Sequence, residues 1–450
     1  MCGGDDMVRR AVHFPFFALI VCLIALAICY YGAGVTSAND GLNMIGFSAA
    51  SSGMGGADLV ARGDAAQLNN NPAALSLIRK VDAELDLAAI LTNLHHQDQF
   101  GNNGKGQNNP FLLANGGYAR RLTSHLTVGV GIFSQGGLGT EFRRLNTAFG
   151  TKDDTSSFLR YAKLAVGASY EFDNGLVIGV APNIGYSDAS PRLFPNTSVP
   201  GVFAGFQIPD LCSRNLGAGQ VGGPCPYDVV FGVKAGVLYH LNKEITIGAA
   251  YTSPVKFNYK NGEAIFNLTS VGLGNVTYNT NIDGFRWPQQ IDWGIAYQPT
   301  PQWILALKGG WINWNALNNI TITTSQPSNP AAPPNLPAIN LPFNWRDQWV
   351  FALGGEYQPV KDIVFLRAGY HYSTNPIPSE NLTPLTQVIL KNHLTAGLGC
   401  RFLDNWYFDA ASIFGLRNRV TYTNTSLPFG TNAVESPSAI IVDATVSYRF

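Results

Sequence analysis

Hydrophobic and polar residues alternate along most of the chain beyond residue 80. In the segment 440–450, for example, Ile440, Val442 and Ala444 occupy every second position, with polar or oppositely directed residues between them. A period of two predicts β-strands with one apolar face. Such stretches lie at 81–91, 111–121, 124–135, 159–172, 176–190, 228–242, 245–262, 285–299, 303–322, 344–358, 363–374, 386–403, 406–422 and 438–450.

The composition changes how these strands are interpreted. The chain is 46% hydrophobic but only 13% charged, whereas soluble globular domains carry about 25% charged residues. Each apolar face is about as long as a tilted strand must be to cross a bilayer, roughly 9–11 residues of strand. Aromatic residues such as Tyr448 and Phe450 collect near strand ends. Because lipid offers the backbone no hydrogen-bond partners, such strands must close on themselves. We therefore predict an all-β fold, a transmembrane antiparallel β-barrel of about 14 strands, over a soluble β-sandwich.

The N-terminus differs from the rest of the chain. Arg9 and Arg10 precede an apolar run over 14–31, and small residues follow up to Ala38. This order is typical of a secretory signal peptide, predicted here as 1–38, although the run is long enough for an uncleaved anchor helix. Together with the aromatic C-terminal strand, it predicts a multi-pass protein of the outer membrane of a Gram-negative bacterium. The formal net charge of zero gives no reason to expect a nucleic-acid partner.

The mature chain divides into two predicted parts. Residues 39–80 are rich in glycine, alanine and asparagine and alternate poorly, whereas 81–450 carry the strands. Cys212 and Cys225 share one polar loop, and export to an oxidising compartment favours a disulfide between them over two unpaired cysteines. Cys400 lies on an apolar strand face, where it acts as a small apolar residue.

One strand loses its alternation partway. From Leu126 to Ile132 the pattern is regular, but Phe133 falls on the face of small residues and Ser-Gln-Gly-Gly follows. Paired glycines and a misplaced aromatic residue are typical of a bulge or kink. In a strand that faces lipid such a break is costly, because the unpaired backbone groups need new partners.

These parts, in this order, resemble the FadL/TodX family of outer-membrane transporters for long-chain fatty acids and other hydrophobic compounds. The hatch signature of that family matches Asn71, Pro72 and Ala73, and its third-strand element matches 137–142, Gly-Leu-Gly-Thr-Glu-Phe. The resemblance implies that 39–80 form a hatch in the lumen, 81–450 the barrel, and that the protein is a monomer. It also implies a lateral opening in the wall at Phe133, Ser134, Gln135, Gly136, Gly137, Leu138 and Gly139.

The resemblance further implies passive transport, in which ligand is captured between two outer loops, bound in the lumen and released sideways through the kinked strand. The loops 191–227 and 263–284 supply the apolar candidates Val202, Phe203, Phe206, Ile208, Phe266 and Leu268, which otherwise form a self-packed loop. The candidates for a carboxylate head group are Arg192, Lys234, Lys308 and Arg367. Such bases also pair with lumen carboxylates or with the hatch residues Asp58, Arg62 and Asp64.

The substrate class stays open at this point. Arg192 lies within one residue of a basic position of the family's fatty-acid transporters, but 315–322 contain no base at a second such position. A fatty acid and an uncharged aromatic or alkane hydrocarbon therefore both remain candidates, with outer-membrane lipid as the surrounding partner. Enzyme signatures are absent, the histidines show no metal-ligand spacing, and we expect no cofactor and no metal. The alternatives are a general diffusion porin and, less favoured, a barrel-type lipid hydrolase.

Overall fold

The computed structural model describes residues 40–107, 110–209, 226–424 and 428–450. The predicted signal peptide 1–38 and both cysteines of the expected disulfide, Cys212 and Cys225, lie outside the described residues. Within them, the strands form one 20-stranded sheet and one 4-stranded sheet, so the all-β prediction is confirmed. A search of the described helices finds none long and apolar enough to span a membrane.

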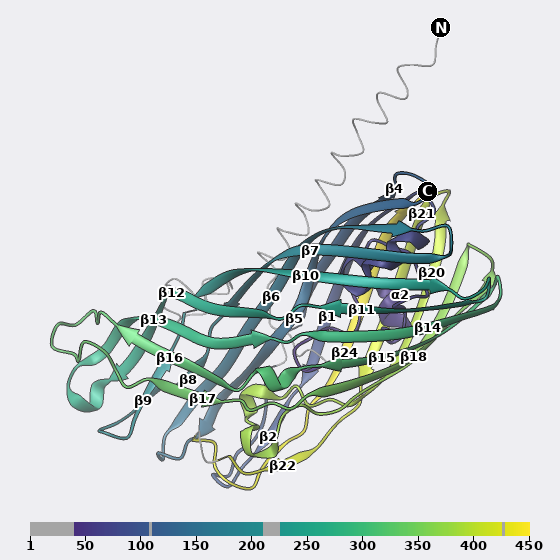
Figure 1. The fold of residues 1–450 in the computed structure, drawn as a ribbon. Coiled ribbons are helices and arrows are strands. Elements are labelled where there is room, and N and C mark those ends of the chain that lie inside the picture. Colours follow the sequence, from purple (N-terminus) through teal and green to yellow (C-terminus); the bar gives the residue numbers. More distant parts are fainter. Residues whose placement is uncertain (1–39, 108–109, 210–225, 425–427) are drawn as a thin grey trace.

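Most strands of the large sheet form a circuit of antiparallel pairs (Figure 1). Strand β1 pairs with β24 along one edge and with β4 along the other. The series of paired strands that starts at β1 therefore ends at β1 again. The circuit consists of β1 (Val81–Asn93), β4 (Phe111–Arg121), β5 (Leu126–Asn146), β6 (Lys152–Glu171), β7 (Leu176–Ala189), β10 (Tyr227–His240), β11 (Ile245–Thr252), β14 (Gln290–Thr300), β15 (Trp303–Ile312), β18 (Gln348–Val360), β19 (Val364–Ser373), β20 (Asn392–Leu403), β21 (Trp406–Gly415) and β24 (Ser438–Arg449).

The long connections between these strands carry further structure at one end of the circuit (Figure 1). The additional strands of the large sheet are β8 (Arg192–Val199), β9 (Phe203–Gln207), β12 (Val255–Leu268), β13 (Gly274–Trp287), β16 (Asn319–Ser325) and β17 (Ile339–Pro342). The small sheet consists of β2 (His95–Gln97), β3 (Asn103–Lys105), β22 (Val420–Tyr422) and β23 (Ala433–Glu435). Short 3₁₀ turns lie at η2 (Thr269–Val271), η3 (Trp314–Ala316), η4 (Ser379–Asn381) and η5 (Pro384–Thr386).

The outer face of the circuit is apolar, whereas its inner face also carries polar and charged side chains. In β10, Val229 and Phe231 are exposed on the outer face. Val230 and Lys234 are buried on the inner face. The same alternation recurs in other strands of the circuit, where exposed leucine, valine and aromatic residues face away from buried Asp, Thr and Ser. An outer surface of this kind is stable in lipid and unfavourable in water. The alternation read from the sequence therefore corresponds to an outer and an inner face.

The N-terminal segment 40–80 packs against strands from widely separated parts of the circuit. It contains α2 (Ala49–Gly53), α3 (Gln67–Asn70) and η1 (Pro72–Leu77). Helix α2 contacts β19, β20, β21 and β24, whereas η1 contacts β5, β6, β7 and β10. Figure 1 accordingly shows α2 surrounded by strands. That this segment forms a hatch, and that the hatch ends at residue 80, both stay predictions.

Small residues allow this close approach. A Cβ atom at Gly179 of β7 would lie 2.2 Å from the backbone nitrogen of Ala73, and one at Gly354 of β18 would lie 2.3 Å from the carbonyl oxygen of Met54. Any larger side chain at these wall positions would have to displace the backbone of the segment. The glycine-rich composition of the strands thus matches the glycine- and alanine-rich segment that they enclose.

Asn71 fixes the start of η1 and ties it to its surroundings. Its Oδ1 accepts a hydrogen bond from the Ala73 N–H at 3.1 Å, and its Nδ2 donates to the Leu59 carbonyl at 3.2 Å. The side chain therefore satisfies a backbone donor and a backbone acceptor that are both buried.

We predict that Asn71→Ala destabilises the segment locally by about 1–3 kcal/mol, because a cap and a buried hydrogen bond are lost together. Hydrogen exchange of the amides over 72–78, followed by mass spectrometry, measures the effect. The control is Asn70→Ala, which removes only a 3.4 Å contact to Asp58. Equal exchange in both variants would contradict the role assigned to Asn71.

Candidate functional site

Strand β5 parts from β4 in the middle of the wall. The β4–β5 pairing ends at Gly116 and Ile132, although the other edge of β4 stays paired with β1 as far as Phe111. Strand β5 itself continues to Asn146, paired with β6. The sequence pattern had predicted a strand ending at residue 135, and this boundary is wrong because the strand bends there rather than ends.

The bend is a β-bulge at Gln135. Ser134 pairs with Ala162 and Gly136 with Tyr161, so Gln135 is an extra residue on β5. Gly136 has a φ of 149°, and a Cβ atom there would lie 1.9 Å from the carbonyl oxygen of Leu42. From Gly131 to Thr140 every residue is buried, so that the strand no longer presents an exposed apolar face. All seven predicted lateral-opening residues, Phe133, Ser134, Gln135, Gly136, Gly137, Leu138 and Gly139, lie in this stretch.

The N-terminal segment adds hydrogen-bond partners for β5 where its ladder with β4 ends, while on β4 the Asn115 Oδ1 accepts from the Ser134 N–H at 2.9 Å. Asn43 forms a β-bridge with Gly136, the Met44 N–H donates to the Gln135 carbonyl at 3.2 Å, and the Gly137 N–H donates to the Leu42 carbonyl at 3.0 Å. The backbone groups released by the bulge are therefore satisfied from inside the circuit.

Side chains reinforce this contact. The Oδ1 atom of Asn43 accepts hydrogen bonds from Gln135 Nε2 and from Trp287 Nε1, both at 2.8 Å. Asn69 Nδ2 donates to Gln135 Oε1 at 3.1 Å, and the rings of Phe47 and Phe133 meet edge to face with centroids 6.0 Å apart. We call the contact of Leu42, Asn43 and Met44 with the bulge the latch.

Three of the four predicted head-group bases are engaged with carboxylates. Lys308 Nζ lies 3.6 Å from Asp292, and Arg192 lies 3.6 Å from Asp154. The Arg367 guanidinium bonds to Glu356 at 2.7 Å and to Asp409 at 2.6 Å. The structure therefore does not gather these bases around one position. Lys234 is buried, and no described residue forms an ion pair or hydrogen bond with its ammonium group.

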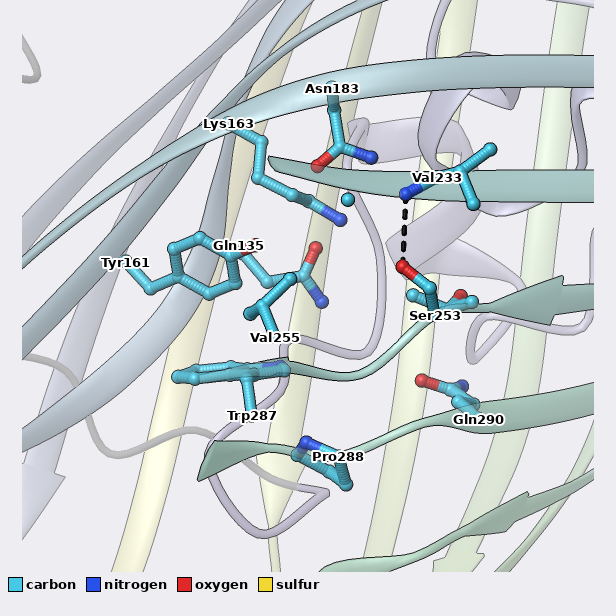
Figure 2. Close-up of a pocket in the computed structure, with 12 residues that line it drawn as sticks. Gln135, Tyr161, Lys163, Asn183, Val233, Ser253, Val255, Trp287, Pro288 and Gln290 are labelled. Atoms are coloured by element: carbon cyan, nitrogen blue, oxygen red, sulfur yellow. Dashed lines mark hydrogen bonds between the residues drawn. The ribbon is translucent and has the colours of Figure 1, made fainter. Parts of the chain in front are cut away.

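A small cavity lies in the lumen beside the bulge (Figure 2). About 10 Å³ is open to the centre of a water molecule, which is room for roughly one water. Gln135, Tyr161 and Lys163 line one side, and Figure 2 shows the Lys163 side chain extending between Asn183 and Gln135. Val233, Ser253 and Val255 line the other side, where the β10–β11 pairing ends at Lys234 and Thr252. Sequence alternation placed Lys163 on the inner face of β6, but nothing in the pattern singled it out.

The apolar candidates of the outer loops lie together in one apolar cluster, with the exception of Val202. Phe206 of β9 pairs with Phe266 of β12, and their rings stack with centroids 5.4 Å apart. Ile208 and Leu268 are buried in the same apolar cluster, with Phe203 packed against it. Val202 is 71% exposed and lies apart from the cluster. The two predicted capture loops therefore adjoin through aromatic contacts in their described parts.

A buried histidine ties the small outer sheet together. His96 Nδ1 lies 2.6 Å from Glu435 Oε1, and His96 Nε2 lies 3.1 Å from Asp98 Oδ2. The Tyr422 hydroxyl donates to Glu435 at 2.7 Å, and the Gln387 amide donates to the same carboxylate. Burial opposes a charge on the imidazole, but the hydrogen bonds to Asp98 and Glu435 outweigh it and raise the pKa of His96 to about 9. Among the described residues no group of His, Cys, Asp or Glu is arranged to hold a metal ion.

A β-sheet circuit with an apolar outer face and a chain segment packed inside it defines the class of outer-membrane β-barrels. Residues 31–450 match the family model of the outer membrane protein transport proteins (OMPP1/FadL/TodX). The chain belongs to this family, and it is accordingly an outer-membrane β-barrel protein of the kind found in Gram-negative bacteria.

Individual relatives support the same assignment. The long-chain fatty acid transport protein of Escherichia coli O6:H1 is 22% identical over 436 residues, which cover 89% of this chain and 92% of that one. The toluene transporter TodX of Pseudomonas putida superposes with a TM-score of 0.72 at 23% identity, covering 90% of this chain and 99% of that one. A Pseudomonas aeruginosa FadL homologue gives 0.72 at 15% identity, covering 91% and 100%. At these identities the superpositions show the shared fold.

We predict that Asn43→Ala lowers the free energy needed to open the latch locally by about 1–3 kcal/mol. The reason is that Gln135 and the buried Trp287 indole lose their common acceptor. Faster hydrogen exchange at the Met44 and Gly137 amides measures this. Asn43→Asp keeps an acceptor for both donors and should restore slow exchange. Unchanged exchange in the alanine variant would show that the side-chain bonds do not hold the latch.

We also predict that the outer sheet weakens in alkali. The pKa of His96 in the folded protein, about 9, exceeds the ordinary histidine pKa of about 6.5. The stabilisation from the protonated imidazole is therefore complete below about pH 6.5 and is lost as the pH rises through about 9. Between about pH 6 and pH 10 the free energy of unfolding of the small sheet should fall by roughly 3 kcal/mol. Exchange at the β2 and β23 amides, corrected for intrinsic rates, measures it. His96→Asn should flatten the pH dependence, whereas His95→Asn should not.

Proposed function

We propose that the protein carries hydrophobic small molecules, either long-chain fatty acids or aromatic or alkane hydrocarbons, passively across the outer membrane. The observation that carries this proposal is the break between β4 and β5, which the latch covers from inside. The relatives support it, because one is named a long-chain fatty acid transport protein and another a toluene transporter. These names describe transport rather than chemistry, and we propose no enzymatic activity.

The route follows from where apolar surfaces lie. Ligand is captured at the outer loops, near the Phe206–Phe266 stack, and then enters the lumen beside Tyr161 and Trp287. Segment 40–80 acts as the hatch that blocks straight passage, so the ligand leaves sideways where β5 parts from β4. An apolar solute gains little from a wet channel but partitions favourably into lipid.

The latch determines when this route is open. With Leu42, Asn43 and Met44 in place, residues 131–140 are buried and their backbone is satisfied. Displacement of the latch removes the partners of the Gln135 carbonyl and the Gly137 N–H, beyond the point where the β4–β5 ladder ends. We infer that lateral exit is gated by movement of the hatch.

A general diffusion porin is the second candidate, and the packing of the lumen argues against it. Such a porin conducts water and ions through an open channel. Here segment 40–80 contacts strands on several sides, and the lumen cavity beside the bulge has room for roughly one water molecule. A low steady conductance in planar bilayers is the corresponding expectation.

We predict that Gly136→Val combined with Gly137→Val abolishes uptake while the barrel still assembles. Valine favours regular extended backbone and cannot occupy position 136 without displacing Leu42, so β5 should straighten and pair with β4. Uptake of radiolabelled fatty acid and of toluene by cells, with and without the gene, measures the effect and decides the substrate class.

Assembly is checked by the heat-dependent mobility of the barrel on gels. The matched control is Gly355→Val in β18, where a Cβ atom meets the Leu305 side chain at 3.5 Å and the Ile304 carbonyl oxygen at 3.7 Å, both ordinary contacts. Undiminished uptake in the assembled double variant would exclude lateral exit at this break.

A further inference from the structure

One histidine of the wall ties down the N-terminal end of the latch. Asp40 and Asn43 exchange two backbone hydrogen bonds, each 3.1 Å long, and so close the turn that contains Leu42. The Asp40 side chain reaches β19, where its Oδ1 atom lies 2.7 Å from Nε2 of His371. The other ring nitrogen of His371, Nδ1, lies 3.0 Å from the carbonyl oxygen of Gly55. His371 therefore contacts the segment at two points, one of them at the base of the latch.

Both ring nitrogens of His371 face acceptors, and this fixes the protonation state of the ring. The Gly55 carbonyl can only accept a hydrogen bond, so Nδ1 must carry a proton, and the ionised Asp40 carboxylate requires a second proton on Nε2. A neutral imidazole has only one N–H. Asp40 and His371 are both buried, so water does not substitute for either bond. The two bonds therefore exist together only when the ring is an imidazolium.

The carboxyl partner is the anion of this pair. Burial alone would raise the pKa of the Asp40 carboxyl, but the charge and the hydrogen bond of His371 outweigh burial and hold that pKa below its ordinary value. Among the described residues, Asp40 and His371 form an ion pair only with each other. The pair thus joins the latch to the wall by a charge-assisted hydrogen bond.

Other titratable groups lie near the pair. His393 of β20 is directly opposite His371, and the two rings meet edge to face with centroids 5.5 Å apart. Two cations this close repel each other, so a charge on His371 favours a neutral His393. The further charged side chains on this part of the inner face are engaged in the pairs Lys308–Asp292, Arg367–Glu356 and Arg367–Asp409, and Asp58 of the segment accepts from the Ser51 hydroxyl.

We propose that protonated His371 is a positioning residue that holds the latch closed, and that loss of its proton releases the latch. The inference rests on the proposed gating of lateral exit and deepens it by naming the group that regulates the gate. Without the proton on Nε2, the ring turns a lone pair toward the Asp40 carboxylate, and the attraction between them becomes a repulsion. The turn from Asp40 to Asn43 then loses its side-chain anchor, while the bond to Gly55 persists.

The test follows hydrogen exchange at the Met44 and Gly137 amides, which donate across the latch. It uses the full-length protein in detergent micelles from about pH 5 to about pH 9, which spans the range in which histidine side chains commonly titrate. After correction for intrinsic rates, exchange in the wild type should rise about 10-fold or more with pH, as loss of a charge-assisted hydrogen bond requires. His371→Asn keeps a donor for Gly55 but has none for Asp40, so its exchange should be fast at every pH.

Asp40→Asn separates an effect of protonation from a merely structural one. The asparagine amide can donate to Nε2 of the neutral ring, and its carbonyl can accept from the protonated ring, so a bond forms at both ends of the pH range. Exchange in this variant should therefore stay slow in alkali, where the wild type loosens. His240→Gln, which replaces a histidine at the end of β10, should keep the pH dependence of the wild type.

Uptake of radiolabelled toluene by cells connects the anchor with transport. Toluene carries no charge at any pH, so a pH-dependent difference between variants reports on the protein. Relative to cells with His240→Gln, cells with Asp40→Asn should take up toluene more slowly in alkali and equally fast at low pH. Cells with His371→Asn should take it up faster at low pH.

Corrected exchange that does not change with pH in the wild type would overturn the proposal, and so would the same rise in Asp40→Asn. Uptake that does not follow the exchange rates would overturn the role of His371 in the gate. If the variants fail to assemble, the pH profile of the wild type decides alone. If no variant takes up toluene at any pH, the transport proposal fails, whereas the exchange rates still decide whether His371 holds the latch.

Discussion

The structure depends on one constraint: a backbone N–H or C=O group within a bilayer must find its partner inside the protein. The circuit from β1 to β24 and back meets this requirement for the strands that pair along both edges. The bulge at Gln135 breaks the pattern, because β5 leaves β4 and releases backbone groups in the wall. Leu42, Asn43 and Met44 supply the missing partners, so the wall and the segment inside it form one hydrogen-bonded unit.

This constraint links residues that otherwise have little in common. Gly136 must lack a side chain, because Leu42 occupies the space where a Cβ atom would be. Asn43 must accept two hydrogen bonds, because Gln135 and Trp287 both donate to it. The backbone bonds of the latch are few and involve a short segment rather than a full strand.

The charges in the lumen divide into two kinds. Arg62 pairs with Glu356 and joins the segment to the wall, whereas Arg367 and Lys308 pair with carboxylates of neighbouring wall strands. These pairs stabilise the structure only because both members of each pair are present. Lys163 has no such partner among the described residues, and it lies beside the break, opposite Phe133 of β5. Paired charges thus stabilise the lumen, and Lys163 is an exception to this pairing among the described residues.

The sequence by itself determined the all-β fold, the inner and outer faces and the position of the break, because alternation with a period of two and its interruption are local properties. It also indicated the family through Asn71-Pro72-Ala73 and the element over 137–142. Only the tertiary structure decided that β5 continues past residue 135, that Arg192, Lys308 and Arg367 are engaged with carboxylates, and that Lys163 is not. The physical reason is that ion pairs and substitute backbone partners join residues far apart in the chain, such as Asn43 and Trp287, and no local pattern records those distances.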